Sequence, residues 1–132
     1  MLSRRFILLI STAFLAGGST SALAAPRNPI KMFDTDADGT LDLDEVKKAA
    51  AALFARLDRD HDGTVDRREL AGRLTAREFA AADPDHDGTL SLDEYLAIVQ
   101  QRFNAANRDN DRTLDAKELS TPAGRAHLRL LR

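Results

Sequence analysis

The sequence contains no cysteine and no tryptophan, and aromatic residues make up only 5% of it. The lack of cysteine excludes disulfide bonds and a lipid-modified cysteine at a processed N-terminus. Five aromatic residues remain after the first two dozen positions: Phe33, Phe54, Phe79, Tyr95 and Phe103. A segment of about 108 residues with so few large side chains can bury only a modest core. We therefore expect that something besides the core stabilises the fold.

The most apolar stretch, residues 6–16, is too short to span a membrane as a helix. Two arginines precede it, and an Ala-Leu-Ala cleavage site ends at Ala24. This pattern predicts a secretory signal peptide over residues 1–24, and therefore an exported protein that is periplasmic or secreted. An uncleaved anchor is the alternative. Residues 3–8 also resemble a twin-arginine signal, but the motif is incomplete, so the export route stays open.

Acidic residues follow a repeated pattern downstream. Three twelve-residue windows, 34–45, 58–69 and 83–94, each have Asp at positions 1, 3 and 5, Gly at position 6, Thr at position 7 and Glu at position 12. When a chain curls around one cation, positions 1, 3 and 5 point inward. The glycine takes the positive φ of a sharp turn, and the glutamate supplies two oxygens. Oxygen ligands without Cys or His indicate Ca²⁺, with Mg²⁺ as a competitor.

On these three windows the chain resembles the EF-hand family, and the repeats extend over most of residues 25–132. The resemblance implies an all-α fold, built as an array of helix–loop–helix units within one domain over residues 25–132. The implied ligands are the side chains at positions 1, 3, 5 and 12, the carbonyl at position 7, and position 9, usually through water. These residues are Asp34, Asp36, Asp38, Thr40, Asp42 and Glu45 in site 1; Asp58, Asp60, Asp62, Thr64, Asp66 and Glu69 in site 2; and Asp83, Asp85, Asp87, Thr89, Ser91 and Glu94 in site 3.

A fourth window, 107–118, follows the pattern less well. It has a neutral Asn107 at position 1 and Arg112 at position 6, where a side chain pays for positive φ and places a positive charge nearby. Two alternatives stay open for this degenerate loop 4: weak Ca²⁺ binding, or a structural role as the partner of loop 1. Its candidate ligands are Asn107, Asp109, Asp111, Thr113 and Glu118.

The four windows hold 20 of the 21 acidic residues, and only Glu78 lies outside them. Each loop therefore gathers several like charges within a short distance, and these charges repel one another until a cation neutralises them. We expect ion binding and folding to be coupled.

Apolar periodicity predicts short helices shared between loops. Residues 46–57 and 95–106 each form one amphipathic helix, and the second carries Leu92 on its apolar face. A helix of the first length keeps loops 1 and 2 apart, whereas two short helices within residues 70–82, broken near Leu74, bring loops 2 and 3 together. Val65 and Leu90 are then expected to pair as short strands. Short helices are also predicted from Pro29 and, after the Thr121 cap, through Leu131.

Several function classes are excluded by what is missing. There is no nucleophile motif or phosphate loop, and His61, His86 and His127 have no converging partners for zinc or catalysis. Residues 25–132 hold 17 basic and 21 acidic residues, a net charge of about −4 that disfavours nucleic acid. We expect no enzyme activity, no nucleic-acid partner and no stable membrane contact.

Three functions remain for a Ca²⁺-binding chain: a sensor, a buffer, or a structural module that docks on an unidentified protein partner. Sensors commonly line their target groove with methionine, and after residue 24 this sequence has only Met32. We therefore favour an exported protein whose fold is stabilised by Ca²⁺ and which acts as an interaction or structural module or as a buffer. A sensor that exposes an apolar groove is the alternative.

Overall fold

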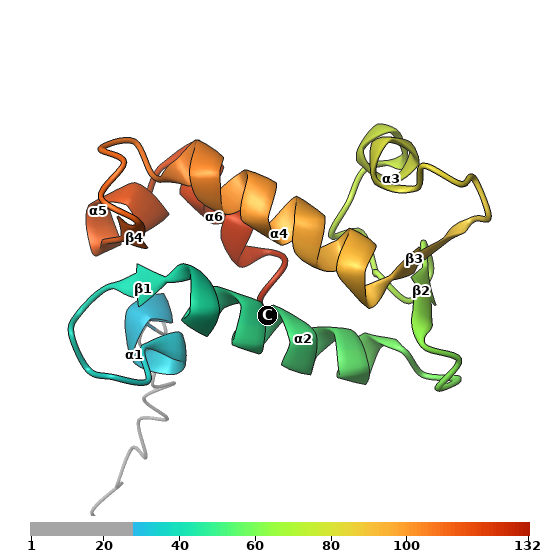
Figure 1. Cartoon of the computed structure of the whole chain (residues 1–132), viewed down its shortest axis with the longest axis horizontal. Helices are drawn as coiled ribbons and strands as arrows, with labels where there is room; N and C mark the ends of the chain where they lie inside the picture. Colours follow the sequence, from blue (N-terminus) through green and yellow to red (C-terminus); the bar gives the residue numbers. More distant parts are fainter. Residues whose placement is uncertain (1–27) are drawn as a thin grey trace, which may run out of the picture.

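The structure is a computed structural model and describes residues 28–132, so the predicted signal peptide and its cleavage site lie outside the described residues. Within this part, α2 and α4 lie side by side and antiparallel, and loops cluster at both ends of the pair (Figure 1). No helix among residues 28–132 is long and apolar enough to cross a bilayer. The elements in chain order are α1 (Pro29–Phe33), β1 (Leu41–Asp42), α2 (Leu43–Leu57), β2 (Thr64–Asp66), α3 (Ala76–Ala82), β3 (Thr89–Ser91), α4 (Leu92–Ala106), β4 (Thr113–Leu114), α5 (Ala116–Leu119) and α6 (Pro122–Leu128).

The two helices predicted over residues 46–57 and 95–106 form, and each begins three residues earlier than predicted, so that each has 15 residues. Helix α2 contains neither Gly nor Pro, and a capping box closes its first turn. The Glu45 N–H donates to Asp42 Oδ1 at 2.8 Å, and the Asp42 N–H donates to Glu45 Oε2 at 3.1 Å. Ser91 and Glu94 make the same box at the start of α4. At 1.5 Å per residue each helix is about 22 Å long, which keeps loops 1 and 2 at opposite ends of α2.

The loops pair through short antiparallel strands. β2 pairs with β3 in the predicted register, with Val65 opposite Leu90. At the other end of the helix pair, β1 pairs with β4, with Leu41 opposite Leu114. All four of these position-8 side chains are fully buried. Loop 4 is therefore the structural partner of loop 1, one of the two roles that the sequence left open; whether it also binds an ion stays a prediction.

The segment between loops 2 and 3 differs from the prediction of two short helices. Only α3 is helical, whereas residues 67–72 form consecutive turns and residues 73–74 are bends. The Leu70 N–H donates to the Asp66 carbonyl at 3.0 Å, but Ala71 and Gly72 then take φ values of 50° and 78°. This left-handed pair ends the first helical turn at once, because an α-helix cannot contain such residues. Thr75 caps α3 through a capping box with Glu78, which agrees with the predicted break near Leu74.

The core lies between α2 and α4 and is completed by the end of the chain. The Phe54 and Tyr95 rings meet with centroids 5.6 Å apart. Helix α6 ends at Leu128 rather than at the predicted Leu131, and residues 129–131 are turns. This tail packs inward: Leu130 is fully buried, and its carbonyl accepts a hydrogen bond from the Tyr95 hydroxyl at 2.7 Å. Tyr95 is itself fully buried, and this burial raises the pKa of its hydroxyl to about 12.

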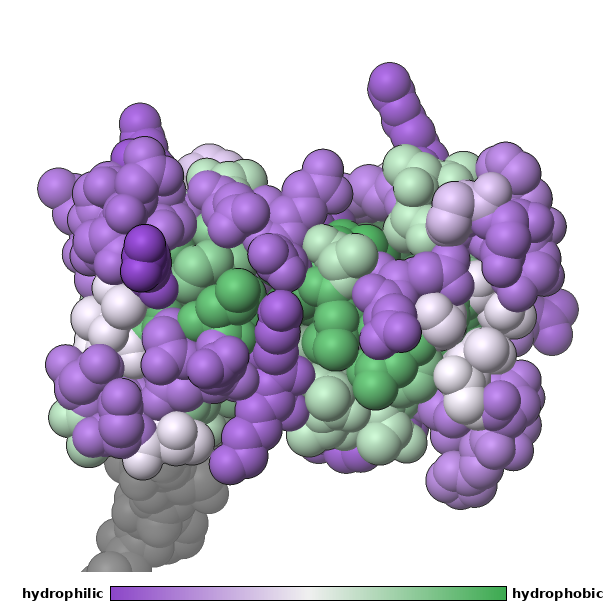
Figure 2. Space-filling model, viewed as in Figure 1, coloured by the Kyte–Doolittle hydropathy of each residue, from purple (hydrophilic) through white to green (hydrophobic). Residues whose placement is uncertain are grey.

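Among residues 28–132, two large apolar side chains are exposed. Leu92, predicted on the buried face of α4, is 37% exposed because it is the first residue of the helix, at the edge of loop 3. Met32 is 42% exposed. On the face shown in Figure 2, hydrophobic residues lie towards the middle and are bordered by hydrophilic ones.

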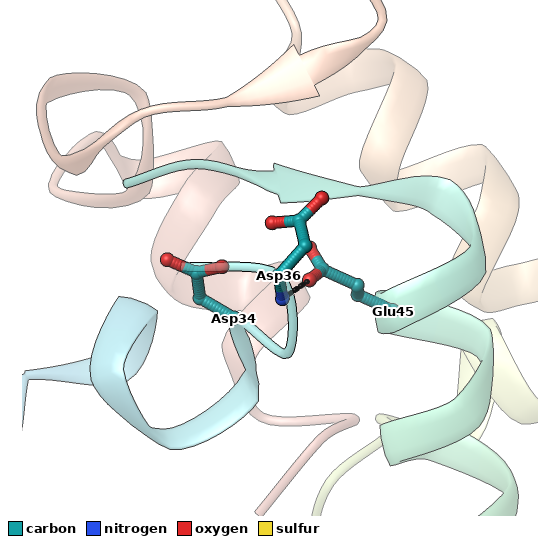
Figure 3. A group of neighbouring side chains, drawn as sticks. All are labelled: Asp34, Asp36 and Glu45. Carbon is teal, nitrogen blue, oxygen red and sulfur yellow. Dashed lines mark hydrogen bonds between the residues drawn. The ribbon is translucent and has the colours of Figure 1, made fainter. Parts of the chain in front are cut away.

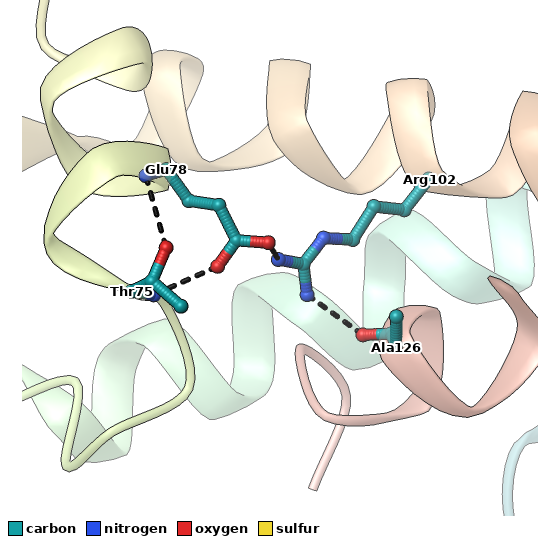
Figure 4. A network of polar contacts seen from close by, with 4 residues as sticks. All are labelled: Thr75, Glu78, Arg102 and Ala126. Atoms are coloured by element: carbon teal, nitrogen blue, oxygen red, sulfur yellow. Dashed lines mark hydrogen bonds and ion pairs between the residues drawn. The ribbon is translucent and has the colours of Figure 1, made fainter. Parts of the chain in front are cut away.

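Arg102 joins three helices in a small polar network (Figure 4). Its guanidinium donates to the Ala126 carbonyl of α6 at 2.7 Å and to Glu78 Oε1 of α3 at 2.8 Å. Glu78 also accepts from the Thr75 N–H at 2.7 Å. These contacts lower the pKa of Glu78, the Thr75 backbone hydrogen bond most and the Arg102 charge further. The network fixes α3 and α6 against α4.

Candidate metal centres

Four groups of carboxylates lie at the two ends of the helix pair, one in each loop. In every group one oxygen from each of three residues falls within 4.8 Å of the others. In loops 1 to 3 the three residues occupy positions 1, 3 and 12, and in loop 4 they occupy positions 3, 5 and 12. The groups are Asp34, Asp36 and Glu45; Asp58, Asp60 and Glu69; Asp83, Asp85 and Glu94; and Asp109, Asp111 and Glu118.

Figure 3 shows how loop 1 assembles its group. Asp34 and Asp36 come from the loop, whereas Glu45 comes from the first turn of α2. Glu45 is only 7% exposed, and the Asp36 N–H donates to its Oε1 at 3.3 Å. The predicted ligands at positions 1, 3 and 12 are therefore neighbours in space.

The position-1 aspartates shape loops 1 to 3 through the backbone. Gly39 takes a φ of 83°, as predicted, and its N–H donates to Asp34 Oδ2 at 2.9 Å. The glycines of loops 2 and 3 make the same bond to Asp58 and Asp83, each at 3.0 Å. In this way the turn that needs a left-handed residue also holds a predicted ligand carboxylate in place.

Loop 4 lacks this contact. Arg112 takes the predicted positive φ, at 73°. Among residues 28–132, no hydrogen-bond donor reaches the buried Oδ1 of Asn107, the position-1 side chain. Loop 4 thus keeps the backbone turn of loops 1 to 3 but lacks a position-1 carboxylate held by the N–H of position 6.

The predicted ligands at positions 5 and 9 have visible structural roles. The position-5 carboxylates accept hydrogen bonds from the position-7 threonines; in loop 1 the Thr40 N–H and hydroxyl both donate to Asp38 Oδ1 at 2.9 Å. The position-9 side chains Asp42, Asp66 and Ser91 accept from the position-12 N–H at 2.8–3.2 Å. Direct ligation by these residues stays a prediction.

The position-12 glutamates differ in one respect. In loops 1, 2 and 4 the N–H of position 2 donates to this carboxylate, at 2.6 Å from Thr35, 2.8 Å from Arg59 and 2.9 Å from Arg108. In loop 3 position 2 is Pro84, which has no N–H. Within the described residues, Glu94 Oε2 is buried and receives no hydrogen bond.

The electrostatics of the loops are dominated by like charge. Desolvation and the neighbouring Asp58 raise the pKa of Asp60. The side-chain hydrogen bond shared with Asp83, and then burial, raise the pKa of Asp85. In the described part of the chain, the one ion pair within 4.0 Å joins Arg102 to Glu78, outside the loops. No Lys or Arg of this part therefore neutralises a loop carboxylate at close range.

The set of possible ligand atoms in the four loops fits a hard cation. Carboxylate and carbonyl oxygens predominate, and the unpaired buried oxygens of Glu94 and Asn107 face loops that supply no proton donor to them. His61 and His86 are exposed at position 4 and belong to none of the four groups. Their backbones have φ values of 56° and 54°, a left-handed conformation that no residue pattern predicted at position 4.

A family model described as "EF hand" matches three consecutive segments, residues 30–49, 50–74 and 76–99. Together the segments include loops 1 to 3 and more than half of the chain, and loop 4 lies outside them. The boundary between the first two segments falls inside α2, which agrees with one helix serving two loops. None of the curated proteins compared matches the chain.

Proposed function

The chain belongs to the EF-hand family, a calcium-binding fold, and we propose that it is an exported protein whose fold is completed by Ca²⁺. In this role it acts as a calcium-dependent interaction or structural module, or as a buffer. The observation that carries the proposal is the placement of four carboxylate groups at both ends of one small core, with no Lys or Arg ion-paired to them among residues 28–132.

Uncompensated carboxylates so close together disfavour the folded chain. A bound divalent ion removes the repulsion, and its binding free energy then becomes folding free energy. Sites 1, 2 and 3 would hold the ion through the side chains at positions 1, 3, 5 and 12. A bidentate position-12 glutamate favours Ca²⁺, because Mg²⁺ requires a smaller octahedral site. Mg²⁺ is the expected competitor.

The packing of the tail supports a structural or buffering role over that of a sensor. A sensor exposes an apolar groove when the ion binds. Here Leu128, Leu130 and Leu131 of the chain's own tail are buried in the core, and Tyr95 of α4 holds the tail by the hydrogen bond to the Leu130 carbonyl. The core surface that would receive a target is therefore already covered.

Export is proposed from the sequence of residues 1–24, with cleavage after Ala24. Outside the cytoplasm Ca²⁺ is abundant enough for sites with dissociation constants of about 10⁻⁴–10⁻³ M to fill. Mass spectrometry of protein recovered from the periplasm or medium tests this part: the expected N-terminal residue is Ala25. The intact chain retained in the cytoplasm would contradict it.

We propose no catalytic step for this chain. The carboxylates that could serve as acids or bases are the same groups that would hold the ion, so they are not free to exchange protons with a substrate. Calcium ions are the proposed partner, and a docking protein is compatible with the structural role.

Circular dichroism and a hydrophobic dye, recorded with EGTA and with millimolar Ca²⁺, separate the roles. A gain of helical signal with Ca²⁺ and no gain in dye fluorescence is the expected result. A dye signal that rises with Ca²⁺ on an already folded chain indicates the sensor. A folded chain that changes in neither signal indicates a buffer whose fold does not need the ion.

A further inference from the structure

Loops 2 and 3 form a natural comparison because they pair with each other and carry the same residues at most ligand positions. Both have Asp at positions 1, 3 and 5, His at position 4, Gly at position 6, Thr at position 7 and Glu at position 12. Their strands β2 and β3 are hydrogen-bonded neighbours. Differences in ion affinity between them must therefore arise from the remaining positions.

Position 2 is the first difference. In loop 2 the Arg59 N–H donates to Glu69 Oε2 at 2.8 Å, so this carboxylate oxygen has a partner within the protein. In loop 3 Pro84 has no N–H, and Glu94 Oε2 is buried without a donor among residues 28–132. A cation that binds Glu69 through both oxygens competes with a hydrogen bond, whereas one that binds Glu94 satisfies an unpaired buried oxygen.

Charge acts in the same direction. Loop 2 holds five acidic residues together with Arg59, Arg67 and Arg68. Loop 3 also holds five acidic residues but neither Lys nor Arg. The net charge of loop 3 is therefore more negative than that of loop 2, which favours a divalent cation there. At position 9 the difference is opposite, because loop 2 has Asp66 and loop 3 has the neutral Ser91, so the order of binding is argued from Pro84.

We propose that site 3 takes the first Ca²⁺ of the paired loops 2 and 3, before site 2, and that Pro84 sets this order by leaving Glu94 without a backbone donor. This inference rests on the proposed function, since it presumes that both loops bind Ca²⁺. It assigns an affinity-determining role to a residue whose side chain is exposed and holds no ligand atom.

Site-resolved NMR can follow the two loops separately. The Gly63 and Gly88 N–H groups donate to the position-1 aspartates of sites 2 and 3, so each amide reports on its own loop. In a Ca²⁺ titration of the ¹⁵N-labelled protein, we expect the Gly88 amide to respond at about tenfold lower Ca²⁺ than Gly63. If neither glycine, nor Gly39 of loop 1, responds up to 10 mM Ca²⁺, the proposed function itself fails.

Two substitutions test the role of Pro84. Pro84→Ala restores an N–H without adding charge, and we expect it to weaken Ca²⁺ binding at site 3 by about tenfold. Arg59→Pro removes the N–H from loop 2, and Arg59→Ala is its matched control, which removes the same charge but keeps the donor. The preceding residues accept proline equally well, because Asp58 and Asp83 have ψ values of 77° and 79°.

We expect Arg59→Pro to bind Ca²⁺ at site 2 about tenfold more tightly than Arg59→Ala. The inference is overturned by a Gly63 response at or before that of Gly88 in the unsubstituted protein. It is also overturned by an unchanged Gly88 midpoint in Pro84→Ala, or by equal Gly63 midpoints in the two Arg59 variants. In each of these cases Ca²⁺ still binds, so the proposed function survives.

Discussion

His127 is predicted to make the fold sensitive to mild acid. Its ring is fully buried and meets the Phe103 ring edge-on, with centroids 5.9 Å apart. Among the described residues, neither ring nitrogen has a hydrogen-bond partner. Burial, and then the charge of Arg102, lower the pKa of His127 to about 4, from an ordinary 6.5.

The direction of this pH dependence follows from the difference in proton uptake between the folded and unfolded chains. Between pH 6.5 and pH 4 the unfolded chain binds a proton at this histidine and the folded chain does not, so the free energy of unfolding falls as the pH drops. At 1.36 kcal/mol per pKa unit the loss reaches about 3 kcal/mol below pH 4, and it is about 2 kcal/mol at pH 5. Above pH 6.5 this contribution disappears.

The perturbation that tests this is His127→Leu, which removes both unpaired nitrogens at similar volume. Urea unfolding followed by circular dichroism, at saturating Ca²⁺ and pH 7.5 to 4.5, gives the free energy of unfolding of each protein. Loop carboxylates titrate in both proteins, so their effects cancel in the difference. We expect the advantage of the variant to grow by about 2 kcal/mol between pH 7.5 and 5. Parallel pH curves for the two proteins would refute the reasoning.

His127→Gln is the matched control for this experiment. Glutamine keeps a buried polar group but does not titrate, so its stability difference from His127→Leu should not change with pH. A difference that grows in acid would mean that polarity, not proton uptake, produces the effect.

Three further predictions concern the metal centres and the packing. Glu45→Gln, Glu69→Gln and Glu94→Gln are each expected to lower the Ca²⁺ stoichiometry by about one ion in calorimetry, and unchanged stoichiometry would reject the assigned sites. Gly124→Ala places a methyl group against the backbone of residues 118–119, so it should lower the free energy of unfolding by about 2 kcal/mol or more in urea titrations; a neutral effect would contradict this close approach. Arg102→Ala removes two hydrogen bonds, and thermal unfolding should show a loss of about 1–2 kcal/mol, greater than that of Glu78→Ala, because Glu78 is the more exposed half of the ion pair.

The features that the sequence predicts well are those encoded within about one helical turn or one loop. The Asp-x-Asp-x-Asp-Gly spacing predicts the turn at Gly39, and the capping residue Thr75 predicts the start of α3. The unbroken apolar stripe of α2 also limits the topology, because a helix of that length separates its two loops. From there the pairing of loop 2 with loop 3 follows, with Val65 opposite Leu90.

The features that the sequence does not predict depend on contacts between residues distant in the chain, or on backbone geometry that composition does not reveal. The turns after loop 2 depend on a left-handed Ala71, a conformation that alanine rarely takes. The burial of His127 and Leu130 depends on the tail folding back onto α4, and no local pattern distinguishes them from surface residues. Gly124 is unfavourable in a helix by propensity. It is needed because α6 meets the end of α5 there and leaves no room for a side chain, a contact that the sequence does not show.

The free energy of unfolding as a function of Ca²⁺ concentration tests the central claim most directly. An ion that binds only the folded chain adds about 2.7 kcal/mol per site at a concentration of 100 times the dissociation constant, so three sites add about 8 kcal/mol, as much as a typical domain's whole stability. We predict no cooperative unfolding transition in EGTA and a cooperative one whose urea midpoint rises steadily with Ca²⁺. The same cooperative midpoint in EGTA and in millimolar Ca²⁺ would contradict the account.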